Sequence, residues 1–412
     1  MKRNILTNSF WLLLFQFFKI IFPIITLPYL TRIMTTEAYG VVSYTKTIMT
    51  YMQLFVDFGF MLSGTKDIIK ALGKKNKVQK AFEETYTARL ILGIMGFGLV
   101  LAISLVLPLA RANILFVFLS YVAVFLTIFL FDFYFRGIEK MHIITIRFAI
   151  MKILSTLALF TFVKSDKDML LIPLLDILAA AVAIIFVSKE LKKDEIKLHI
   201  SNIKKAFAKI KDSFVYFLSN AASNSLSALT TIIIGIFLTS TDVAYWGLAM
   251  QIIGTIQSCY SPISDAIYPE MIKTKSLKLI KRILLIMTPI ILAGTAIVFL
   301  LSPLVITILG GEDYAPAIQI LQITTPCLFF GFLAIILGWP ALGSINKQKQ
   351  TTITTVFSLL VNILTIILLA TTDHLTLITL AFARILGDLS LFISRLFFVY
   401  KYRNDFNKRE LQ

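Results

Sequence analysis

Residues Ser9 to Leu30 read SFWLLLFQFFKIIFPIITLPYL, a run of 22 residues in which almost every side chain is apolar. A helix needs about 20 apolar residues to cross the hydrocarbon core of a bilayer, so this stretch is long enough to cross once. Lys19 stands in the middle of it. A charged side chain at the centre of a spanning helix costs about 2.5–3.5 kcal/mol on insertion scales, so its presence needs a physical reason.

Similar apolar runs recur along the whole chain of 412 residues, separated by short polar segments. The chain is 58% hydrophobic and only 15% charged, whereas soluble domains carry about 25% charged residues. We therefore expect an all-α polytopic membrane protein with twelve transmembrane helices. The predicted spans are residues 9–30, 41–62, 86–108, 113–135, 142–163, 168–188, 213–238, 243–265, 283–309, 315–338, 350–371 and 375–399.

The basic side chains are unevenly distributed between the two sets of connections. With the N-terminus placed inside, the inner connections hold 29 of the 40 Lys and Arg residues and the outer connections hold four. Basic residues favour the cytoplasmic side of a membrane, so this pattern predicts that both termini are cytoplasmic. Topology alone accounts for the net charge of +17, and we expect no nucleic-acid partner.

The longest polar segment lies near the midpoint and separates two similar halves. The positions aligned by a shift of 204 residues include Gln16 with Asn220, Lys19 with Ser223, and Pro23 with Ser227. The match predicts two six-helix lobes in an internal parallel repeat, with chance similarity between apolar helices as the alternative. The predicted parts are an N-lobe at 1–188, a linker at 189–212, a C-lobe at 213–399 and a cytoplasmic basic tail at 400–412.

Two further patterns concern single helices. Apolar residues recur every three or four positions in the linker, which predicts an amphipathic helix on the inner membrane face. Polar residues share one face of the first span and one face of the seventh. They line a water-filled cavity, or they allow close helix packing. The candidate cavity-lining residues are Gln16, Asn220, Ser223 and Ser227.

Seven cations lie within the predicted spans: Lys19, Lys46, Arg89, Arg147, Lys152, Arg384 and Arg395. Arg89 and Arg395 lie near inner ends, where long side chains extend to the interface. Arg384 lies four residues before Asp388, a spacing at which charges pair on a helix.

The remaining in-span cations belong to the first half of the chain. Lys152 has one potential partner, Asp176, because the fifth and sixth spans form a hairpin. Lys19, Lys46 and Arg147 have no acidic residue at a matching depth in a neighbouring span. This surplus of positive charge favours an anionic ligand and disfavours a cationic one.

Four segments of the chain resemble the polysaccharide-repeat flippases (Wzx-like proteins) of the multidrug/oligosaccharidyl-lipid/polysaccharide exporter superfamily. They are LTRIMTTEAYGVVSYTKTI (30–48), VDFGF (56–60), FDFYFRGIEKM (131–141) and STDVAYWGLAMQIIGTIQSCYSPISDAIYPEM (240–271). The resemblance extends over essentially the whole chain. It implies a MATE-like fold of two six-helix lobes in a bacterial cytoplasmic membrane, and a transporter rather than an enzyme.

The substrate implied by the resemblance is an undecaprenyl-diphosphate-linked oligosaccharide. It is moved from the inner to the outer leaflet by alternating access, for O-antigen, capsule or exopolysaccharide assembly. Ammonium and guanidinium groups bind diphosphate through charge-assisted hydrogen bonds. The candidate substrate-binding residues are Lys19, Lys46, Arg147, Lys152 and Arg384. Membrane lipids and polysaccharide polymerase machinery are the other expected partners.

The resemblance also implies that an ion gradient drives the cycle. We expect no bound cofactor, and a proton or sodium gradient as the energy source. A buried carboxylate can carry a proton across a membrane. The candidates for ion coupling are Asp57, Asp176 and Asp388.

Three alternatives remain open. A multidrug exporter of the same superfamily is expected to carry acidic rather than basic residues in its first-lobe cavity. A lipid II flippase usually has two further C-terminal helices. A membrane-embedded polymerase or ligase generally needs a larger outer loop than this chain offers. No metal site is predicted, because the spacing of His142, His199 and His374 does not suit metal coordination.

Overall fold

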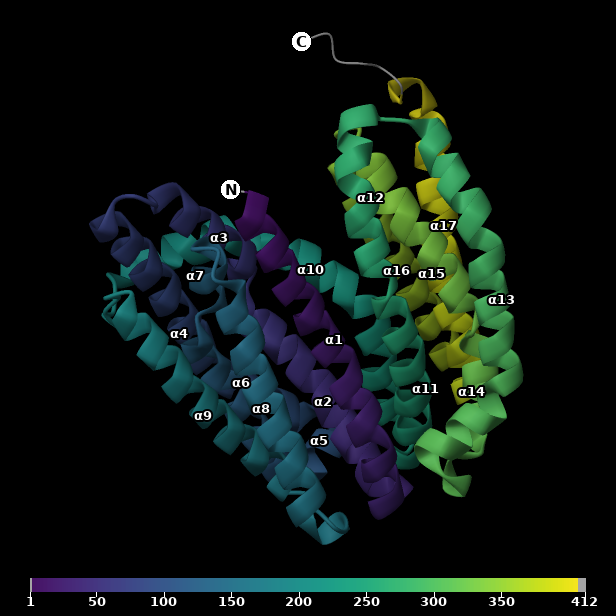
Figure 1. Ribbon diagram of the computed structural model, residues 1–412. Coiled ribbons are helices and arrows are strands. Elements are labelled where there is room, and N and C mark those ends of the chain that lie inside the picture. Colours follow the sequence, from purple (N-terminus) through teal and green to yellow (C-terminus); the bar gives the residue numbers. More distant parts are fainter. Residues whose placement is uncertain (1, 407–412) are drawn as a thin grey trace. The chain divides into compact units, whose positions relative to one another are not determined.

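The computed structural model describes residues 2–406, without the side chains of residues 2–6, 9, 219, 220 and 222–227. Every regular element of this described part is helical (Figure 1). The chain divides into two compact units, Met1–Ala221 (unit 1) and Ala222–Gln412 (unit 2). The boundary lies within helix α10 (Ile203–Phe237), nine residues beyond the predicted start of the C-lobe at 213.

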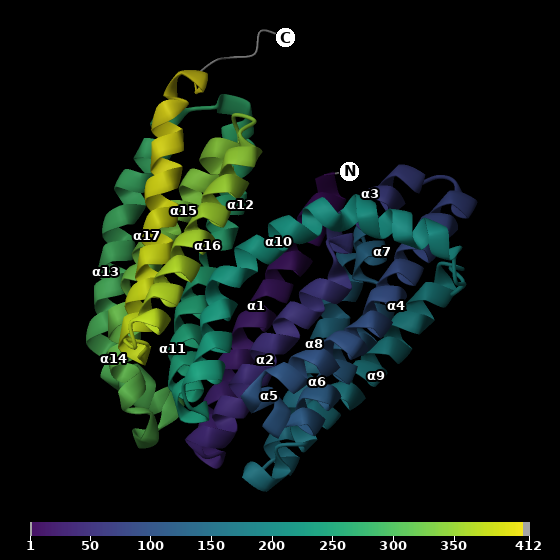
Figure 2. The same ribbon diagram turned by 180° about the vertical axis from the view of Figure 1, so that it is seen from behind.

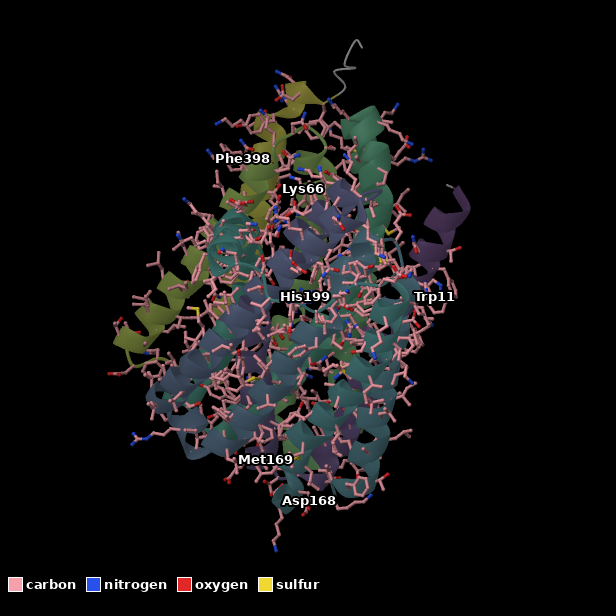
Figure 3. The ribbon with its side chains drawn as sticks, turned by 90° about the vertical axis from the view of Figure 1, so that its left-hand side faces the viewer. Trp11, Lys66, Asp168, Met169, His199 and Phe398 are labelled. Carbon is pink, nitrogen blue, oxygen red and sulfur yellow. The ribbon has the colours of Figure 1, made fainter. Side chains whose placement is uncertain are left out.

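Unit 1 consists of the helices before α10 and the first half of α10 itself. Its other elements are α1 (Lys2–Ile33), α2 (Thr36–Asp57), α3 (Phe60–Ala71), α4 (Lys75–Val106), α5 (Pro108–Ala112), α6 (Ile114–Leu126), η1 (Thr127–Leu130), α7 (Asp132–Gly137), α8 (Met141–Phe162), η2 (Asp166–Asp168) and α9 (Leu171–Lys193). The α8–α9 turn, where Asp168 and Met169 lie, marks one end of unit 1, and Lys66 and His199 lie toward the other end (Figure 3).

Unit 2 contains the second half of α10 and the helices that follow it. Its other elements are α11 (Ser240–Ser258), α12 (Tyr260–Thr274), α13 (Leu277–Gly310), η3 (Glu312–Tyr314), α14 (Pro316–Thr324), α15 (Pro326–Ile336), η4 (Leu337–Gly343), α16 (Gln348–Thr371), α17 (Leu377–Lys401) and η5 (Arg403–Asp405). The inner helices of this unit are α15 and α17, which pack against each other and against several neighbours.

Nine helical stretches in the described part of the chain are long and apolar enough to cross a membrane. They are Phe10–Ile33, Lys75–Val106, Ile114–Gly137, Met141–Phe162, Leu171–Lys193, Leu277–Gly310, Pro316–Gly343, Gln348–Thr371 and Leu377–Lys401. The protein is therefore an integral membrane protein. The other three predicted spans are also helical, as α2–α3, α10 and α11–α12.

The predicted span at 41–62 is broken into α2 and α3 by a tight corner. Phe58 and Gly59 both adopt the left-handed conformation, with φ of 39° and 76°. Gly59 is also where α10 comes closest, because a Cβ built there would lie 2.5 Å from the Cβ of Tyr216. A glycine thus serves both the corner and the close approach of α10.

The first half of α10 docks on this corner and on α3 (Figure 2). The Phe217 ring stacks on Phe58 at a centroid distance of 4.4 Å, and the hydroxyls of Ser63 and Ser213 lie 2.7 Å apart. Lys209 forms an ion pair with Asp67. Burial lowers the pKa of the Lys209 ammonium, as does nearby Lys66, whereas Asp212 raises it.

The linker does not form the single amphipathic helix that was predicted over 189–212. Helix α9 continues to Lys193, residues 194–202 are not helical, and α10 begins at Ile203. The buried side of α10 consists of Ala206, Lys209 and Ser213, while the apolar side chains of Ile203 and Phe207 are exposed. The prediction failed because the non-helical residues form tertiary bonds instead: the Lys197 amide donates to Gln79, and the Ser201 amide donates to Thr87.

The end of unit 1 opposite α3 is fixed by bonds between distant segments. The Asp166 carboxylate accepts hydrogen bonds from the amide and hydroxyl of Thr35, at 2.9 and 2.8 Å. The Tyr29 hydroxyl donates to the carbonyl of Val163 at 2.7 Å. These bonds hold the C-terminal part of α1 against the end of α8.

Candidate functional site

Three helices of unit 1 bring charged side chains together within their spans. Lys46 on α2 lies within electrostatic range of Lys152 on α8 and Asp176 on α9. Helices α8 and α9 form a hairpin and pack along their length, which places Lys152 and Asp176 at a similar depth, as predicted. Lys46 is exposed, and the other two are half-buried. We call Lys46, Lys152 and Asp176 the lysine site.

Within the lysine site, Asp176 is held by a neutral group. The Ser155 hydroxyl, one turn from Lys152 on α8, donates to Asp176 Oδ1 at 2.6 Å. Lys152 does not form an ion pair with its potential partner Asp176. Among the described residues, neither Lys46 nor Lys152 forms an ion pair. The two ammonium groups therefore lie near the same carboxylate without a direct bond to it.

Lys19 lies on α1, outside the lysine site. Its ammonium group lies 5.7 Å from the centroid of the Phe15 ring, one turn earlier on the same helix. Lys19 and Gln16 are both exposed. A stripe of exposed apolar side chains, Phe10, Leu13 and Phe17, covers a different face of α1. The side chains of Asn220, Ser223 and Ser227, the predicted counterparts on α10, lie outside the described part of the structure.

Arg147 was predicted to lack an acidic neighbour, and this prediction is wrong. Its guanidinium is buried and binds Asp132 with two bonds, Nε to Oδ1 at 2.8 Å and Nη2 to Oδ2. Phe131, with φ of 50°, breaks the predicted span at 113–135 and starts α7 at Asp132. The break places Asp132 opposite α8, where a continuous helix would direct it elsewhere. Arg147 is thus part of the protein's interior and not a free cation.

Arg89 and Asp57 form a second pair in unit 1 that the sequence analysis missed. Arg89, predicted to extend to the interface, is 5% exposed and donates from Nη2 to Asp57 Oδ1 at 2.7 Å. Asp57 also accepts a hydrogen bond from Gln53 Nε2 at 2.9 Å. One of the three ion-coupling candidates is therefore already bound to an arginine.

In unit 2 the two in-span arginines are also buried. The predicted pair of Arg384 and Asp388 is formed, with Nη2 and Oδ2 3.4 Å apart and both residues about 5% exposed. Arg395 does not extend to the interface as predicted, but donates to neutral acceptors on neighbouring helices. Arg384, which was predicted to bind the substrate, is thus buried and paired with Asp388 in this structure.

The other features of the described residues offer fewer groups that could bind a charged ligand. No group of three or more His, Cys, Asp or Glu side chains in this part of the chain is close enough to hold a metal ion. Cys259 is exposed and Cys327 is buried, and both are free thiols. An apolar groove of about 450 Å³ lies between α12 and α13, lined by Ile263, Ile267, Ile283 and their neighbours, and offers no polar group for a headgroup.

The chain is similar to known proteins over most of its length. Residues 5–275, about two thirds of the chain, match the family described as "Polysaccharide biosynthesis protein". The chain belongs to this family. The match covers unit 1 from residue 5 onward, including Lys19 and the lysine site, and ends near the α12–α13 turn.

Two relatives of this polysaccharide biosynthesis protein are both named "Putative O-antigen transporter". The protein of Escherichia coli (strain K12) is 27% identical over 364 residues, which cover 85% of this chain and 86% of the relative. The protein of Shigella dysenteriae is 26% identical and covers 78% of this chain and 81% of the relative. The prediction of a transporter rather than an enzyme is confirmed by the family and these relatives.

Solved structures show the same fold at low identity. One is "Lipid II flippase MurJ, inward closed conformation", with a TM-score of 0.69 and 16% identity over 98% of this chain and 94% of that chain. Another is an inward-facing MATE family multidrug resistance transporter of the MOP superfamily. It has a TM-score of 0.68 and 14% identity, over 92% of this chain and 98% of that chain. The MATE-like fold predicted from the sequence is therefore confirmed.

The seven in-span cations of this family member divide by residue type. All four arginines are buried: Arg89, Arg147 and Arg395 donate hydrogen bonds, and Arg384 forms an ion pair with Asp388. The three lysines, Lys19, Lys46 and Lys152, form no ion pair within the described chain and are exposed or half-buried. A guanidinium satisfies several fixed acceptors at once, whereas an ammonium is a mobile point charge. Residue type was the signal that separates the two groups.

Proposed function

We propose that the protein moves an undecaprenyl-diphosphate-linked oligosaccharide from the inner to the outer leaflet of the bacterial cytoplasmic membrane. The observation that carries this proposal is the lysine site. Lys46 interacts electrostatically with Lys152 and with Asp176, and neither lysine forms an ion pair among the described residues. A diphosphate supplies the negative charge that would balance the two ammonium groups.

The energetics of the lysine site favour an anion as its ligand. Two ammonium groups repel each other, and a charge kept out of bulk water without a partner is costly. A diphosphate neutralises both and accepts charge-assisted hydrogen bonds, which are about twice as strong as those between neutral groups. Because the lysines bind no fixed carboxylate, they are free to release the diphosphate on the other side of the membrane.

Lys19 and Gln16 extend the same chemistry along α1. Both are exposed in the structure, and both lie on a helix that contacts α8, which carries Lys152. We infer that Lys19 attracts the diphosphate before or after it occupies the lysine site. Gln16 offers hydrogen bonds to sugar hydroxyls.

The proposal includes a twelve-helix architecture of two repeated lobes. The helix ends support it, because several agree with the shift of 204 residues seen in the sequence. Helices α1 and α10 end at Ile33 and Phe237, α2 and α11 begin at Thr36 and Ser240, and α4 and α13 end at Val106 and Gly310.

The charge distribution supports a topology with both termini in the cytoplasm. The 29 basic residues of the inner connections, against four in the outer ones, fit that orientation. Asp168 lies in η2, between α8 and α9. The hydrogen bond that its carboxylate accepts from the Lys164 amide lowers the pKa of the carboxyl group.

We further propose that a proton or sodium gradient drives the cycle through Asp176. Asp57 and Asp388 are bound to Arg89 and Arg384, and each such pair would have to break to release its carboxylate. Asp176 is bonded only to the Ser155 hydroxyl among the described residues and lies beside two lysines. A proton or sodium ion on Asp176 would change the net charge of the lysine site directly. Asp176→Asn is therefore expected to remove the dependence of transport on the gradient.

A lipid II flippase is the second candidate, because lipid II has the same polyprenyl diphosphate and a protein with that title shares the fold. A multidrug exporter for cations is disfavoured by the excess of lysines over carboxylates in the lysine site. The family description favours a polysaccharide precursor over lipid II.

The proposal is tested by reconstituting the full chain in vesicles with fluorescent undecaprenyl-diphosphate oligosaccharide and measuring its movement between leaflets. The wild-type protein is expected to move it in competition with excess lipid II, and the Lys46→Gln/Lys152→Gln double variant is expected to be inactive. Arg111→Gln, at an exposed outer position, is the matched control. Transport by the double variant at the wild-type rate would contradict the proposal, and movement of lipid II alone would favour the second candidate.

A further inference from the structure

A helix of unit 2 is broken next to a buried arginine. Helix α15 continues directly into η4, whose turns are wider than α-helical turns. Gly338 in η4 has φ of −75° and ψ of −108°, outside the helical region, and Pro340 follows two residues later. Proline has no amide hydrogen to continue a helical ladder, and wide turns of this kind occur frequently at functional sites.

Arg395 on α17 binds the helix just before this break. Its Nη1 donates to the carbonyl of Ala334 at 2.6 Å, and its Nη2 donates to the hydroxyl of Thr355 at 3.1 Å. Its Nε lies 3.4 Å from the hydroxyl of Thr354. One guanidinium therefore connects α15, α16 and α17.

The acceptors around Arg395 are all neutral. Arg395 is 8% exposed and forms no ion pair with any described residue. A buried charge without a carboxylate is costly, and a role in packing alone could be filled by an apolar side chain. Neutral acceptors hold a guanidinium less tightly than a carboxylate does, so this contact can be exchanged.

Gly338 is the residue that lets Arg395 approach. A Cβ built on Gly338 would lie 2.7 Å from Nη1 of Arg395, well inside contact distance. The guanidinium therefore leaves no room for a side chain at this position.

Helix η4 is packed to α12 and not only to its own helix. Leu337, Ala341 and Leu342 are buried in one hydrophobic cluster with Tyr260 and Met271 of α12. Tyr268 and Trp339 also meet edge to face, with ring centroids 6.4 Å apart. The same cluster includes Phe332 and Leu333 of α15, before the break, so a change of angle at Gly338 would alter how η4 packs on both α15 and α12.

We propose that Gly338 is a hinge of unit 2, about which η4 moves relative to α15. Arg395 is the positioning residue that holds the hinge in the conformation seen here, by binding Ala334, Thr354 and Thr355. The motion belongs to the transport cycle and in that respect rests on the proposed function. The contact between Arg395 and the break does not depend on the proposed function.

Hydrogen–deuterium exchange of the full chain in lipid nanodiscs tests the hinge without a substrate. In Arg395→Gln, amides of residues 334–347 are expected to exchange about tenfold faster or more, since a hydrogen bond to a charged group contributes about 1.5–3 kcal/mol. The rest of unit 2 is expected to exchange as in the wild type. Arg395→Lys is expected to lie between the two. Arg403→Gln is the matched control, because Arg403 is exposed and stacks on Tyr400 just beyond the same helix.

A second variant, Gly338→Ala, preserves the charge and addresses the case in which Arg395→Gln does not fold. Its methyl group displaces the guanidinium, so the same local increase in exchange is expected. Unchanged exchange at 334–347, or a uniform increase over all of unit 2, would overturn the hinge. In the vesicle assay, Gly338→Ala is expected to change the turnover rate but not the apparent affinity for substrate. A wild-type protein that moves no lipid-linked oligosaccharide would refute the proposed function while the exchange result still decides the hinge.

Discussion

The two units place positive charge in their spanning helices in different ways. Unit 1 has three lysines, Lys19, Lys46 and Lys152, that form no ion pair with the residues the structure describes, beside two arginine–aspartate pairs. Unit 2 has two arginines in its spans, and both are buried and bonded. The proposed function uses this difference, because it assigns the ligand to the lysines of unit 1 and leaves the arginines of unit 2 to its own helices.

This contrast is also one between lysine and arginine. Arginine has five N–H donors in a rigid fork and matches a carboxylate or several carbonyls at once. The bonds of Arg147 to Asp132 and of Arg395 to Ala334 use that geometry. Lysine has a compact charge on a flexible stem, which suits a ligand that binds and leaves. The following predictions test whether bonded arginines and unpaired lysines have these separate roles.

The largest effect is expected from breaking a bonded arginine. Arg147→Ala leaves Asp132 as an uncompensated carboxylate that is about one fifth exposed, and breaking such a pair typically costs 3–5 kcal/mol. We expect the free energy of unfolding in detergent to fall by about this amount. Chemical denaturation of the purified protein measures it.

The double variant Arg147→Met/Asp132→Asn is the control for Arg147→Ala. It removes both charges, and replacing a buried ion pair as a whole is often nearly neutral for stability. We expect it to recover most of the lost stability and to retain transport. A double variant as unstable as Arg147→Ala would show that Arg147 has a role beyond pairing with Asp132.

Neutralising the unpaired lysines one at a time is expected to have the opposite profile. Lys46→Gln and Lys152→Gln should each lower transport about tenfold or more, because each removes a charged hydrogen bond to the diphosphate. Stability should change by less than about 0.5 kcal/mol, since no fixed partner is left unpaired. Vesicle transport and denaturation of the same preparations measure both quantities. A lysine variant that unfolds easily but transports normally would reverse the comparison.

The sequence predicted the helices well because hydrophobic runs depend only on local composition. The pairing of Arg384 with Asp388 was also predictable, since both lie on one helix at a fixed spacing. The partners of Arg89 and Arg147 were not, because the corner at Phe58–Gly59 and the break at Phe131 redirect whole helices. Such breaks shift the depth of Asp57 and Asp132, and hydropathy gives no sign of them. Likewise, the bonds of Arg395 depend on a helix break 57 residues away in sequence, at Gly338.

Exchanging the two cations sharpens the distinction between them. Lys152→Arg keeps the charge but offers a fork that can reach Asp176, so we expect it to pair there and lower transport by less than Lys152→Gln does. Arg147→Lys keeps its charge but loses one of the two bonds to Asp132, and should cost about 1–2 kcal/mol of stability with transport retained. Wild-type transport by Lys152→Arg would show that only charge matters at the lysine site.

The smallest expected effect concerns the hydroxyl that holds Asp176. Ser155→Ala removes a 2.6 Å hydrogen bond, worth about 1 kcal/mol, from a half-buried carboxylate. Asp176 is then free to turn toward Lys46 or Lys152 and to compete with the diphosphate. We expect the apparent affinity for substrate to weaken about three- to fivefold, with little change in turnover. Ser120→Ala is a suitable control, because that hydroxyl also bonds within unit 1 but only to the carbonyl of Phe116 on its own helix. Equal affinities in Ser155→Ala and the wild type would mean that Asp176 does not compete for the lysines. The lysine site would then act as two separate cations and not as a set of three charges.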